Sequence, residues 1–309
     1  MVMPKRPSPF IREKSNTLME WVHFERTSEK ELRVLRERFG FHPVDVSAVP
    51  PPLQRPKVVF RDGYIFMILP FPLFDYRTRI INASEVDFFI AKDRLVTVNS
   101  DGLPAIQQVF DKFADKNAKR QDIAHVLLEL LNTLLESQFP VLMHLSQDID
   151  EIEKGLFRPD QHEAILELLR IKTNIVNVRK AMQGHKKVIR NLITQSEGIL
   201  PIGRLEEYYN RLVDYTKEIW DELEVQRDTI NALHETHTSL IENRTNEVMK
   251  TLTVFSVIIL PLTLVATLFS MSVGGLPWHN DPSGFLYVVI VLTLFGLLLF
   301  LYFKRKRWI

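Results

Sequence analysis

The chain has 309 residues, 46% of them hydrophobic, and its 39 Lys and Arg nearly balance 38 Asp and Glu, giving a formal net charge of +1. It contains no cysteine, which excludes disulfides, thiolate metal sites and cysteine nucleophiles. It also lacks a P-loop, a G-x-S-x-G motif and paired catalytic carboxylates in a recognisable setting. We therefore expect neither an enzyme nor a resident cofactor, and no nucleic-acid partner.

Residues 1–118 are expected to form a cytoplasmic α/β domain. The opening segment MVMPKRPSPF has no apolar run and is not expected to be a signal peptide. Residues 28–40 predict a helix, because Ser28 and Glu31 have the spacing of a capping box and Gly40 follows as a stop signal.

Two β-hairpins are expected in the same domain. KVVFRDGYIFMILPF contains two β-rich runs around Asp62-Gly63, a dipeptide typical of tight hairpin turns. EVDFFIAKDRLVTVNS repeats this pattern around Lys92 and Asp93. Helices combined with antiparallel strands indicate an α/β fold.

Residues 119–203 are expected to form a cytoplasmic helical region. Their apolar periodicity is long, and Pro140 predicts a kink or a break. The pattern continues after Pro159 through HEAILELLRIKTNIVNVRKAMQGHKKVIRNLI, until GILPIG interrupts it.

One very long helix is expected over residues 204–271. From Arg204 onward no proline occurs before Pro261 and no glycine before Gly274. A helix reaching Met271 would be about 100 Å long at about 1.5 Å per residue. Such a stalk would join the soluble domain to a first membrane span.

Two membrane spans are expected near the C-terminus. No charged residue lies between Lys250 and His279, or between Asp281 and Lys304. Each stretch exceeds the roughly 20 residues that cross about 30 Å of hydrocarbon as a helix. The spans are expected at about 251–271 and at 284–303, separated by an external loop over 272–283 and followed by a basic tail over 304–309.

The flanking charges predict the orientation in the membrane. Arg244 and Lys250 precede the first span and KRKR follows the second, whereas the loop GGLPWHNDPSG holds no Lys or Arg. The positive-inside rule then places both termini in the cytoplasm of a protein of the inner membrane. The basic tail is expected to contact lipid headgroups, or the acids of DIDEIEK.

The long helix carries a polar stripe, because a seven-residue step returns to nearly the same helix face. Acids occupy this face in the cytoplasmic half and hydroxyls in the membrane half. The residues are Asp214, Asp221, Asp228, Glu235, Glu242, Met249, Ser256, Thr263 and Ser270, with Asn246, Thr253, Leu260 and Thr267 beside them.

Two interpretations of this stripe are open. Membrane Ser and Thr commonly bond back to their own helix or permit close packing, and acids on a long helix usually face water. A continuous polar face is shielded from lipid, however, when copies of the helix surround a common axis. That arrangement predicts a cation pathway in an oligomer, with acidic rings at the cytoplasmic end and a hydrophobic gate at Met249 and Leu252.

The segment NRTNEVMKTLTVFSVIILPLTLVATLFSMS, the ending YFKRKRWI and the earlier FGFHPVDVSAVPPPLQRPKVVF resemble CorA-type divalent-cation channels. The resemblance covers nearly the whole chain. It implies a funnel-shaped homopentamer, in which an α/β cytoplasmic domain is followed by a long stalk helix and two transmembrane helices. It also implies that the chain's partners are its own copies, membrane lipid and divalent cations.

The same resemblance implies a pore lining that agrees with the polar stripe. The family's pore-mouth motif is Gly-Met-Asn, and Ser270, Met271 and Ser272 occupy those positions here, so only the methionine is kept. The following VGGLPW is similar to the ZntB zinc-transporting branch. The implied pore residues, together with those of the stripe, are Asn246, Met249, Leu252, Ser256, Leu260, Thr263, Thr267, Ser270 and Ser272.

The family also has a cytoplasmic regulatory metal site between acids of neighbouring subunits. Asp75 fits the first acid, whereas ungapped counting puts the second at Arg211, with Asp214 as the nearby substitute. An Asp75–Arg211 salt bridge without metal is the alternative. His234 and His237 beside Glu235 are a weaker zinc candidate, since histidines on a polar stalk are usually solvated.

The sequence therefore predicts a divalent-cation channel or transporter, with Mg²⁺ as the cation and Zn²⁺, Co²⁺ or another transition metal as alternatives. Mg²⁺ gives up its water reluctantly, so a ring of five Ser272 hydroxyls can recognise the hydrated ion through its water shell. The alternative from another class is a non-conducting membrane scaffold or cation sensor that keeps the fold and has lost the filter.

Overall fold

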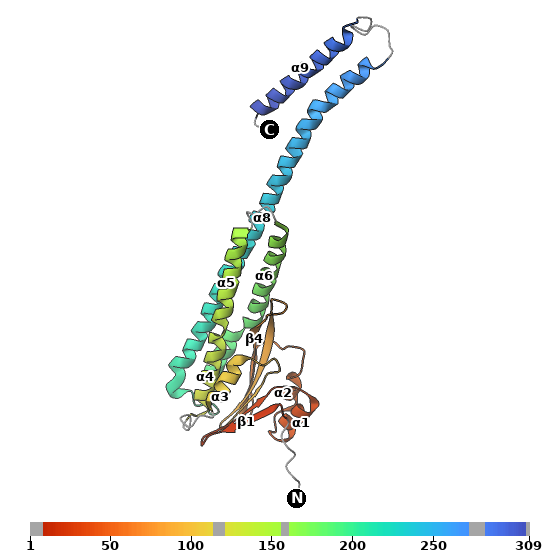
Figure 1. The fold of residues 1–309 in the computed structure, drawn as a ribbon. Coiled ribbons are helices and arrows are strands. Elements are labelled where there is room, and N and C mark those ends of the chain that lie inside the picture. The colour runs from red at the N-terminus through yellow and green to blue at the C-terminus, as the bar shows by residue number, and fades with distance from the viewer. Residues whose placement is uncertain (1–8, 114–120, 156–160, 272–281, 307–309) are drawn as a thin grey trace. The chain divides into compact units, whose positions relative to one another are not determined.

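Our computed structural model describes residues 9–113, 121–155, 161–271 and 282–306, without the side chains of 161–164. The chain separates into two compact units, Met1–Leu233 and His234–Ile309. Figure 1 shows that the first contains a sheet packed with helices and that the second is helical.

A six-stranded mixed sheet in the order β1-β2-β6-β5-β4-β3 organises the first unit. Neighbouring strands are antiparallel except β2 and β6, which are parallel. The strands are β1 (Ile11–Ser15), β2 (Glu20–Phe24), β3 (Lys57–Phe60), β4 (Tyr64–Asp75), β5 (Ile80–Ala91) and β6 (Arg94–Val98).

Both predicted hairpins are present. The Asp62-Gly63 turn joins β3 to β4, and Gly63 has a φ of 85°, which glycine adopts without the steric cost of a Cβ atom. Lys92 and Asp93 connect β5 to β6. Strands β1 and β2 are not predicted from the sequence, because each has only five residues and IREKS has no apolar alternation.

Helices α1 (Glu29–Glu37) and α2 (Pro43–Ala48) pack over one face of the sheet, against residues such as Phe66 and Phe89. Helix α1 is the helix expected at residues 28–40. The Ser28 part of the predicted capping box is wrong, because the Ser28 hydroxyl donates to the Glu31 carboxylate and does not cap the helix.

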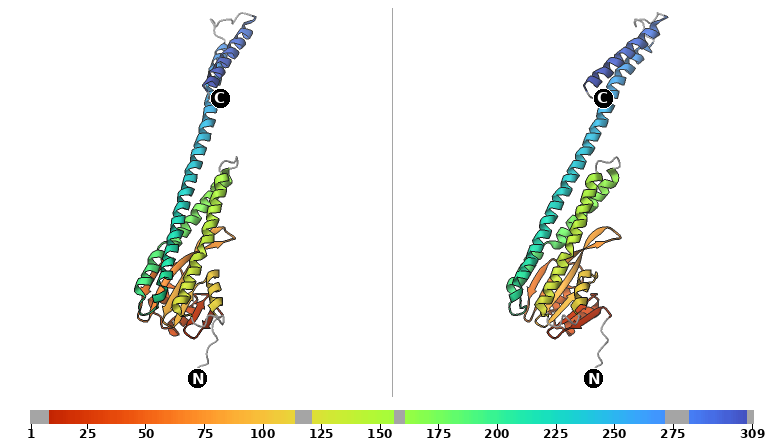
Figure 2. Two further views of the ribbon diagram at one scale, coloured as in Figure 1. Left: turned by 90° about the vertical axis from the view of Figure 1, so that its left-hand side faces the viewer. Right: turned by 60° about the vertical axis from the view of Figure 1, so that its left-hand side comes forward.

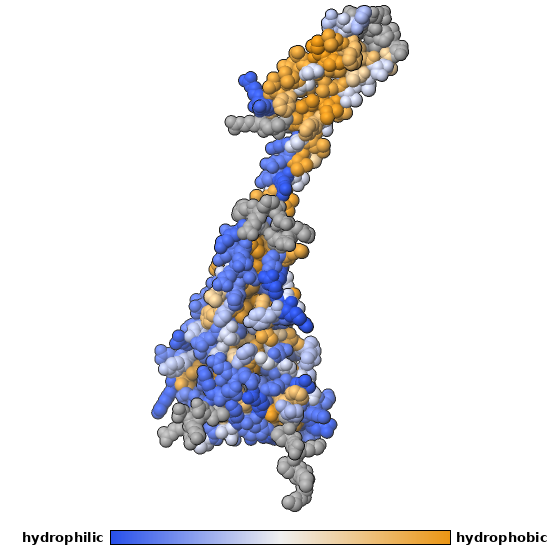
Figure 3. All heavy atoms as spheres, in the orientation of Figure 1, coloured by the Kyte–Doolittle hydropathy of each residue, from blue (hydrophilic) through white to orange (hydrophobic). Residues whose placement is uncertain are grey.

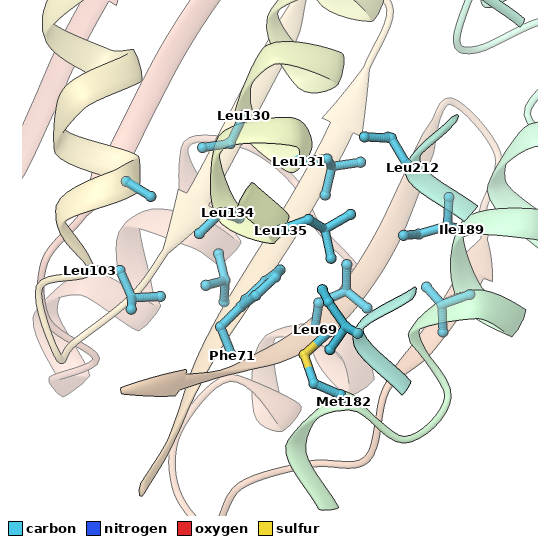
Figure 4. Close-up of a cluster of buried hydrophobic side chains, with 14 of the residues drawn as sticks. Leu69, Phe71, Leu103, Leu130, Leu131, Leu134, Leu135, Met182, Ile189 and Leu212 are labelled. Carbon is cyan, nitrogen blue, oxygen red and sulfur yellow. The ribbon is translucent and has the colours of Figure 1, made fainter. Parts of the chain in front are cut away.

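The opposite face of the sheet shares one hydrophobic core with the remaining helices of the first unit. Figure 4 shows leucines of α4 directed toward Phe71 of β4, and Leu130, Leu131, Leu134 and Leu135 are each 0% exposed. The helices are α3 (Pro104–Phe113), α4 (Ile123–Glu136), α5 (Gln138–Gly155), α6 (Gln161–Met182), α7 (His185–Gln195) and the beginning of α8 (Glu206–Phe269).

Two helix breaks differ from the sequence-based expectation. Pro140 lies in the first turn of α5, and the break falls before it at Ser137. The pattern expected to continue from residue 162 to 193 is interrupted at Gly184, which has a φ of 98°. A Cβ atom at Gly184 would also lie 3.4 Å from the Cβ of Pro56, so the break brings the chain close to the segment before β3.

The first part of α8 packs on α5 and α6, as both views of Figure 2 show. Gln226 Nε2 donates to the Leu142 carbonyl of α5 at 2.9 Å, and Arg179 of α6 pairs with Glu224 of α8. A 3-10 turn, Gly203–Leu205, precedes α8. The predicted long helix is therefore present, as one α-helix of 64 residues with Pro261 inside it.

His185 is a buried titratable group in this core. The side chain is 0% exposed, and its ring meets Phe71 edge-on with 5.1 Å between centroids. Burial lowers the pKa of His185 from 6.5 to about 4. The unfolded chain therefore binds a proton first, and folding stability falls as pH decreases from 6.5 to about 4.

We predict that His185→Phe reduces the acid sensitivity of the fold. The change should remove about 2 kcal/mol of the destabilisation that develops between about pH 6.5 and pH 5. The apparent melting temperature of the detergent-solubilised protein at the two pH values measures it. His144→Gln on the exposed side of α5 is the control, and an equal acid sensitivity in His185→Phe and the parent chain would contradict the prediction.

Candidate functional site

Helix α9 (Gly284–Arg305) covers one side of α8 in the second unit. Gly296 of α9 lies against Leu262 of α8, where an added Cβ atom would be 3.4 Å from Leu262 Cδ1. The least exposed positions recur every three or four residues on both helices, as on one helix face. They are Val254, Ile258, Pro261, Leu262, Val265 and Phe269 on α8, and Gly284, Val288, Leu292, Gly296, Leu299 and Phe303 on α9.

The polar stripe lies on the other side of α8. At about 100° per residue, its centre is about 180° from the centre of the covered face. Every described residue of the predicted pore lining is exposed: Asn246, Met249, Leu252, Ser256, Leu260, Thr263, Thr267 and Ser270. Packing of α9 thus leaves the whole stripe uncovered.

Four hydroxyls of the stripe donate to carbonyls of their own helix. Thr253, Ser256 and Thr263 donate to the residue four positions earlier, at 2.7, 2.9 and 2.8 Å. Thr267 donates to the Leu264 carbonyl at 2.8 Å. The expectation that these residues bond back to their own helix is therefore confirmed.

This bonding determines what the stripe offers to a ligand. A hydroxyl has one proton and two lone pairs, and here the proton is used by the backbone carbonyl. The oxygen can still accept. The stripe consequently presents hydrogen-bond acceptors, which suit a cation or the water molecules around it.

The structure describes the cytoplasmic end of the stripe and its opposite end as far as Met271. Met249 and Leu252, the predicted hydrophobic gate, are 55% and 58% exposed. Helix α8 ends at Phe269, and Ser270 and Met271 follow it with exposed side chains. Ser272 lies outside the described residues, together with the rest of 272–281.

The acids expected along the stalk are all exposed, and Asp228 pairs with its neighbour Arg227 at 2.8 Å. His237 is 4% exposed, whereas His234 is exposed. Within the described ranges, no three Asp, Glu or His side chains converge as a metal site would require. The acids are Asp214, Asp221, Asp228, Glu235 and Glu242.

Asp75 ends β4 and holds the turn that follows. Its carboxylate accepts from the Arg77 N–H and from the Thr78 hydroxyl, both at 2.9 Å. These bonds hold the pKa of Asp75 below its ordinary value, and the bond from Arg77 has the larger effect. Arg211 lies elsewhere in the same chain, with its guanidinium 5.3 Å from the centre of the Tyr215 ring.

Three described helical segments are long and apolar enough to cross a membrane: Ile123–Gly155, Gly203–Phe269 and Gly284–Arg305. In the first, which is α4 with α5, 44% of the apolar window is buried inside the protein, against 6% in each of the others. Figure 3 shows hydrophobic residues exposed over the second unit. Burial therefore separates a core helix pair from two apolar segments that are almost entirely exposed.

A model of the family described as CorA-like Mg²⁺ transporter protein matches residues 17–305. The chain belongs to this family. Among its relatives, the cobalt/magnesium transport protein CorA of Thermotoga maritima is 26% identical over 281 residues, covering 88% of this chain and 78% of the relative.

Two solved structures have the same fold. The complete CorA magnesium transporter from Methanocaldococcus jannaschii matches with a TM-score of 0.84 at 22% identity, over 94% of this chain and 92% of that chain. The full-length CmaX protein matches with a TM-score of 0.75 at 18% identity, over 94% and 89% of the two chains. The resemblance to CorA is thereby confirmed, whereas the pore residues, regulatory acids and pentamer stay predictions.

One part of the site is not predicted from the sequence, namely the face of α8 that α9 covers. The available signal was Gly296, a small residue within GFLYVVIVLTLFGLLLF. Small residues let two helices approach closely in a membrane. Its position alone does not say which residue of α8 it meets.

We predict that Asp75→Ala has little effect on the closing of the channel by Mg²⁺. The Asp75 carboxylate already accepts hydrogen bonds from the turn that follows it. The loss of the turn bonds should lower the stability of the fold slightly. Asp75→Asn, which keeps an acceptor for the turn, is the matched control. Mg²⁺ inhibition of flux into liposomes tests the prediction, and its loss in both variants would instead establish a regulatory site with Asp214 as the expected partner.

Proposed function

We propose that five copies of the chain form a Mg²⁺ channel of the inner membrane, with the α8 stripes lining a central pore. Both termini lie in the cytoplasm, and the segments at 251–271 and 284–303 span the bilayer. The proposal rests chiefly on one observation: α9 covers the face of α8 opposite the stripe.

This packing leaves the polar face only two environments in a membrane, lipid or other copies of itself. A row of acceptor oxygens facing hydrocarbon is unfavourable, because their lone pairs find no donors there. A ring of α8 helices removes the cost by enclosing water. Helix α9 then lies outside the ring with its apolar surface toward lipid.

The chemistry of the stripe supports hydrated cations as the cargo. Hydroxyl oxygens whose protons are committed to the backbone can accept from the waters around a cation. Mg²⁺ dehydrates reluctantly, so passage with its water shell suits it. Met249 and Leu252, both exposed, form the gate at the cytoplasmic end of the apolar segment.

A second candidate is a scaffold or cation sensor that does not conduct. It is favoured by Ser270 and Met271, where the described part of the pore-mouth motif keeps only the methionine. Flux of Mg²⁺, Zn²⁺, Co²⁺ and Ni²⁺ into proteoliposomes decides between the two. We expect proteoliposomes to take up Mg²⁺ and native mass spectrometry to show a homopentamer. A monomer without flux would exclude the pore.

We predict that Thr263→Val lowers Mg²⁺ flux at least about fivefold, because it removes an acceptor worth roughly 1 kcal/mol from the pore wall. Thr293→Val is the matched control, since Thr293 makes the same bond within α9, to the Val289 carbonyl at 2.8 Å, and lies off the stripe. Equal flux in the two variants would mean that the stripe is not the pathway.

We also predict that the pore mouth determines selectivity. Ser272→Ala should lower flux, and Ser270→Gly combined with Ser272→Asn should sharpen the preference for Mg²⁺, because a carboxamide reaches further toward the hydrated ion than a hydroxyl. Competition between Mg²⁺ and Co²⁺ in the flux assay measures this preference. Unchanged flux and selectivity in both variants would show that the segment is only a turn.

A further inference from the structure

Two carboxylates lie side by side on the face of the sheet that α1 and α2 cover. Glu85 and Asp87 are two residues apart on β5 and therefore point to the same side. Asp87 stands between Ile68 of β4 and Val98 of β6 in the strand ladder and is 2% exposed. A carboxylate in such a place is costly unless it has partners.

The partners that the chain supplies are incomplete. The Glu85 carboxylate accepts from the Gln54 N–H, but Asp87 Oδ1 has no hydrogen-bond partner among the described residues. Burial raises the pKa of Asp87 well above its ordinary range, and the charge of Glu85 and a hydrogen bond between the two carboxyl groups add to the rise. Burial likewise raises the pKa of Glu85.

Lys57 attracts both carboxyl groups and lowers the pKa of each, but by less than burial raises it. The Lys57 ammonium lies over the Phe66 ring, 5.6 Å from its centre. In the described part of the chain, neither Glu85 nor Asp87 forms an ion pair.

Asp45 is a buried acid of the same unit whose hydrogen-bond partners are all supplied by the chain. It is also 2% exposed, but its carboxylate accepts from Arg61 at 2.8 and 2.9 Å and from the Tyr64 hydroxyl at 2.7 Å. Burial alone would raise the pKa of Asp45, yet the bonds from Arg61 and Tyr64 outweigh it and lower the pKa. Asp87 has no such arginine.

Glu85 and Asp87 border a cavity of about 270 Å³. The other polar residues that line it offer oxygen atoms, and no histidine is among its described lining residues. These polar residues are Thr27, Asn99, Ser100 and Asp101. A water molecule occupies about 30 Å³ in the liquid, so the cavity can hold an ion with several waters.

We propose that this cavity is a binding site for a hydrated hard divalent cation of the Mg²⁺ class, held by the Glu85 and Asp87 carboxylates. Oxygen ligands select such ions over softer metals. Mg²⁺ typically uses one or two carboxylates and keeps its remaining waters, which fits a cavity lined by Glu85 and Asp87 with Asp101 at its wall. The site is separate from Asp75 and does not require that the chain conduct.

The test uses the full-length protein in detergent, stripped of metal and titrated with Mn²⁺ as a paramagnetic stand-in for Mg²⁺. Free Mn²⁺, followed by electron paramagnetic resonance, counts the ions bound. We expect Asp87→Asn and Glu85→Gln each to lose one bound Mn²⁺ per chain. Asp75→Asn, a change in the predicted regulatory acid, should keep that ion.

Thermal unfolding supplies an independent readout that does not depend on flux. Mg²⁺ should raise the melting temperature of the parent chain and not that of Asp87→Asn. Without metal, Asp87→Asn should be about as stable as the parent, because burial already favours the neutral form of Asp87 and Asn is neutral too. An unchanged Mn²⁺ count in both carboxylate variants, with the Mg²⁺-induced rise intact, would overturn the proposal.

Discussion

Polar groups that are removed from water need partners, and this requirement shapes both units of the protein. In the second unit, hydroxyls on α8 find their partners in the backbone of the same helix, as Thr253 does with the Met249 carbonyl. In the first unit, a buried acid on α2 finds an arginine and a tyrosine. Where the chain supplies too few partners, as at Asp87, an external ligand becomes the natural complement.

Apolar helices in this chain lie in two different environments. The leucines of α4 are covered by the sheet and by the helices around it, so the α4–α5 segment is part of a protein core. The apolar segments of α8 and α9 cover each other on only one side, and their other surfaces remain exposed. Hydropathy alone does not separate these cases, whereas the depth of burial does.

Much of the fold follows from local patterns in the sequence. The Asp62-Gly63 turn and the uninterrupted run to Met271 predict a hairpin and a long helix that are both present. The parallel pairing of β2 with β6 is not predicted, because it joins residues about seventy positions apart and leaves no local signature.

The sequence predicts which side chains share a face in the candidate site, but it does not predict which elements pack around them. Helical periodicity places the hydroxyls of α8 on one face. It does not reveal that α9 packs opposite them, since that depends on Gly296 meeting Leu262. The Glu85–Asp87 pair is also missed, because acids two residues apart in a strand commonly face water. Here the loop after α2 contributes Pro51 and Leu53 to the cavity that Glu85 and Asp87 also line.

The parallel pairing of β2 with β6 also bears on the order of events during synthesis. Strand β2 can pair with β1 early, but it cannot pair with β6 until residue 98 has been made, so the two N-terminal strands join the rest of the sheet late. The first apolar membrane segment begins about 150 residues further on, a delay of roughly ten seconds or more at about 5–20 residues per second. The sheet therefore has time to close before the first apolar segment leaves the ribosome, whereas the helical core of the first unit, which includes the beginning of α8, is completed only shortly before that segment is made.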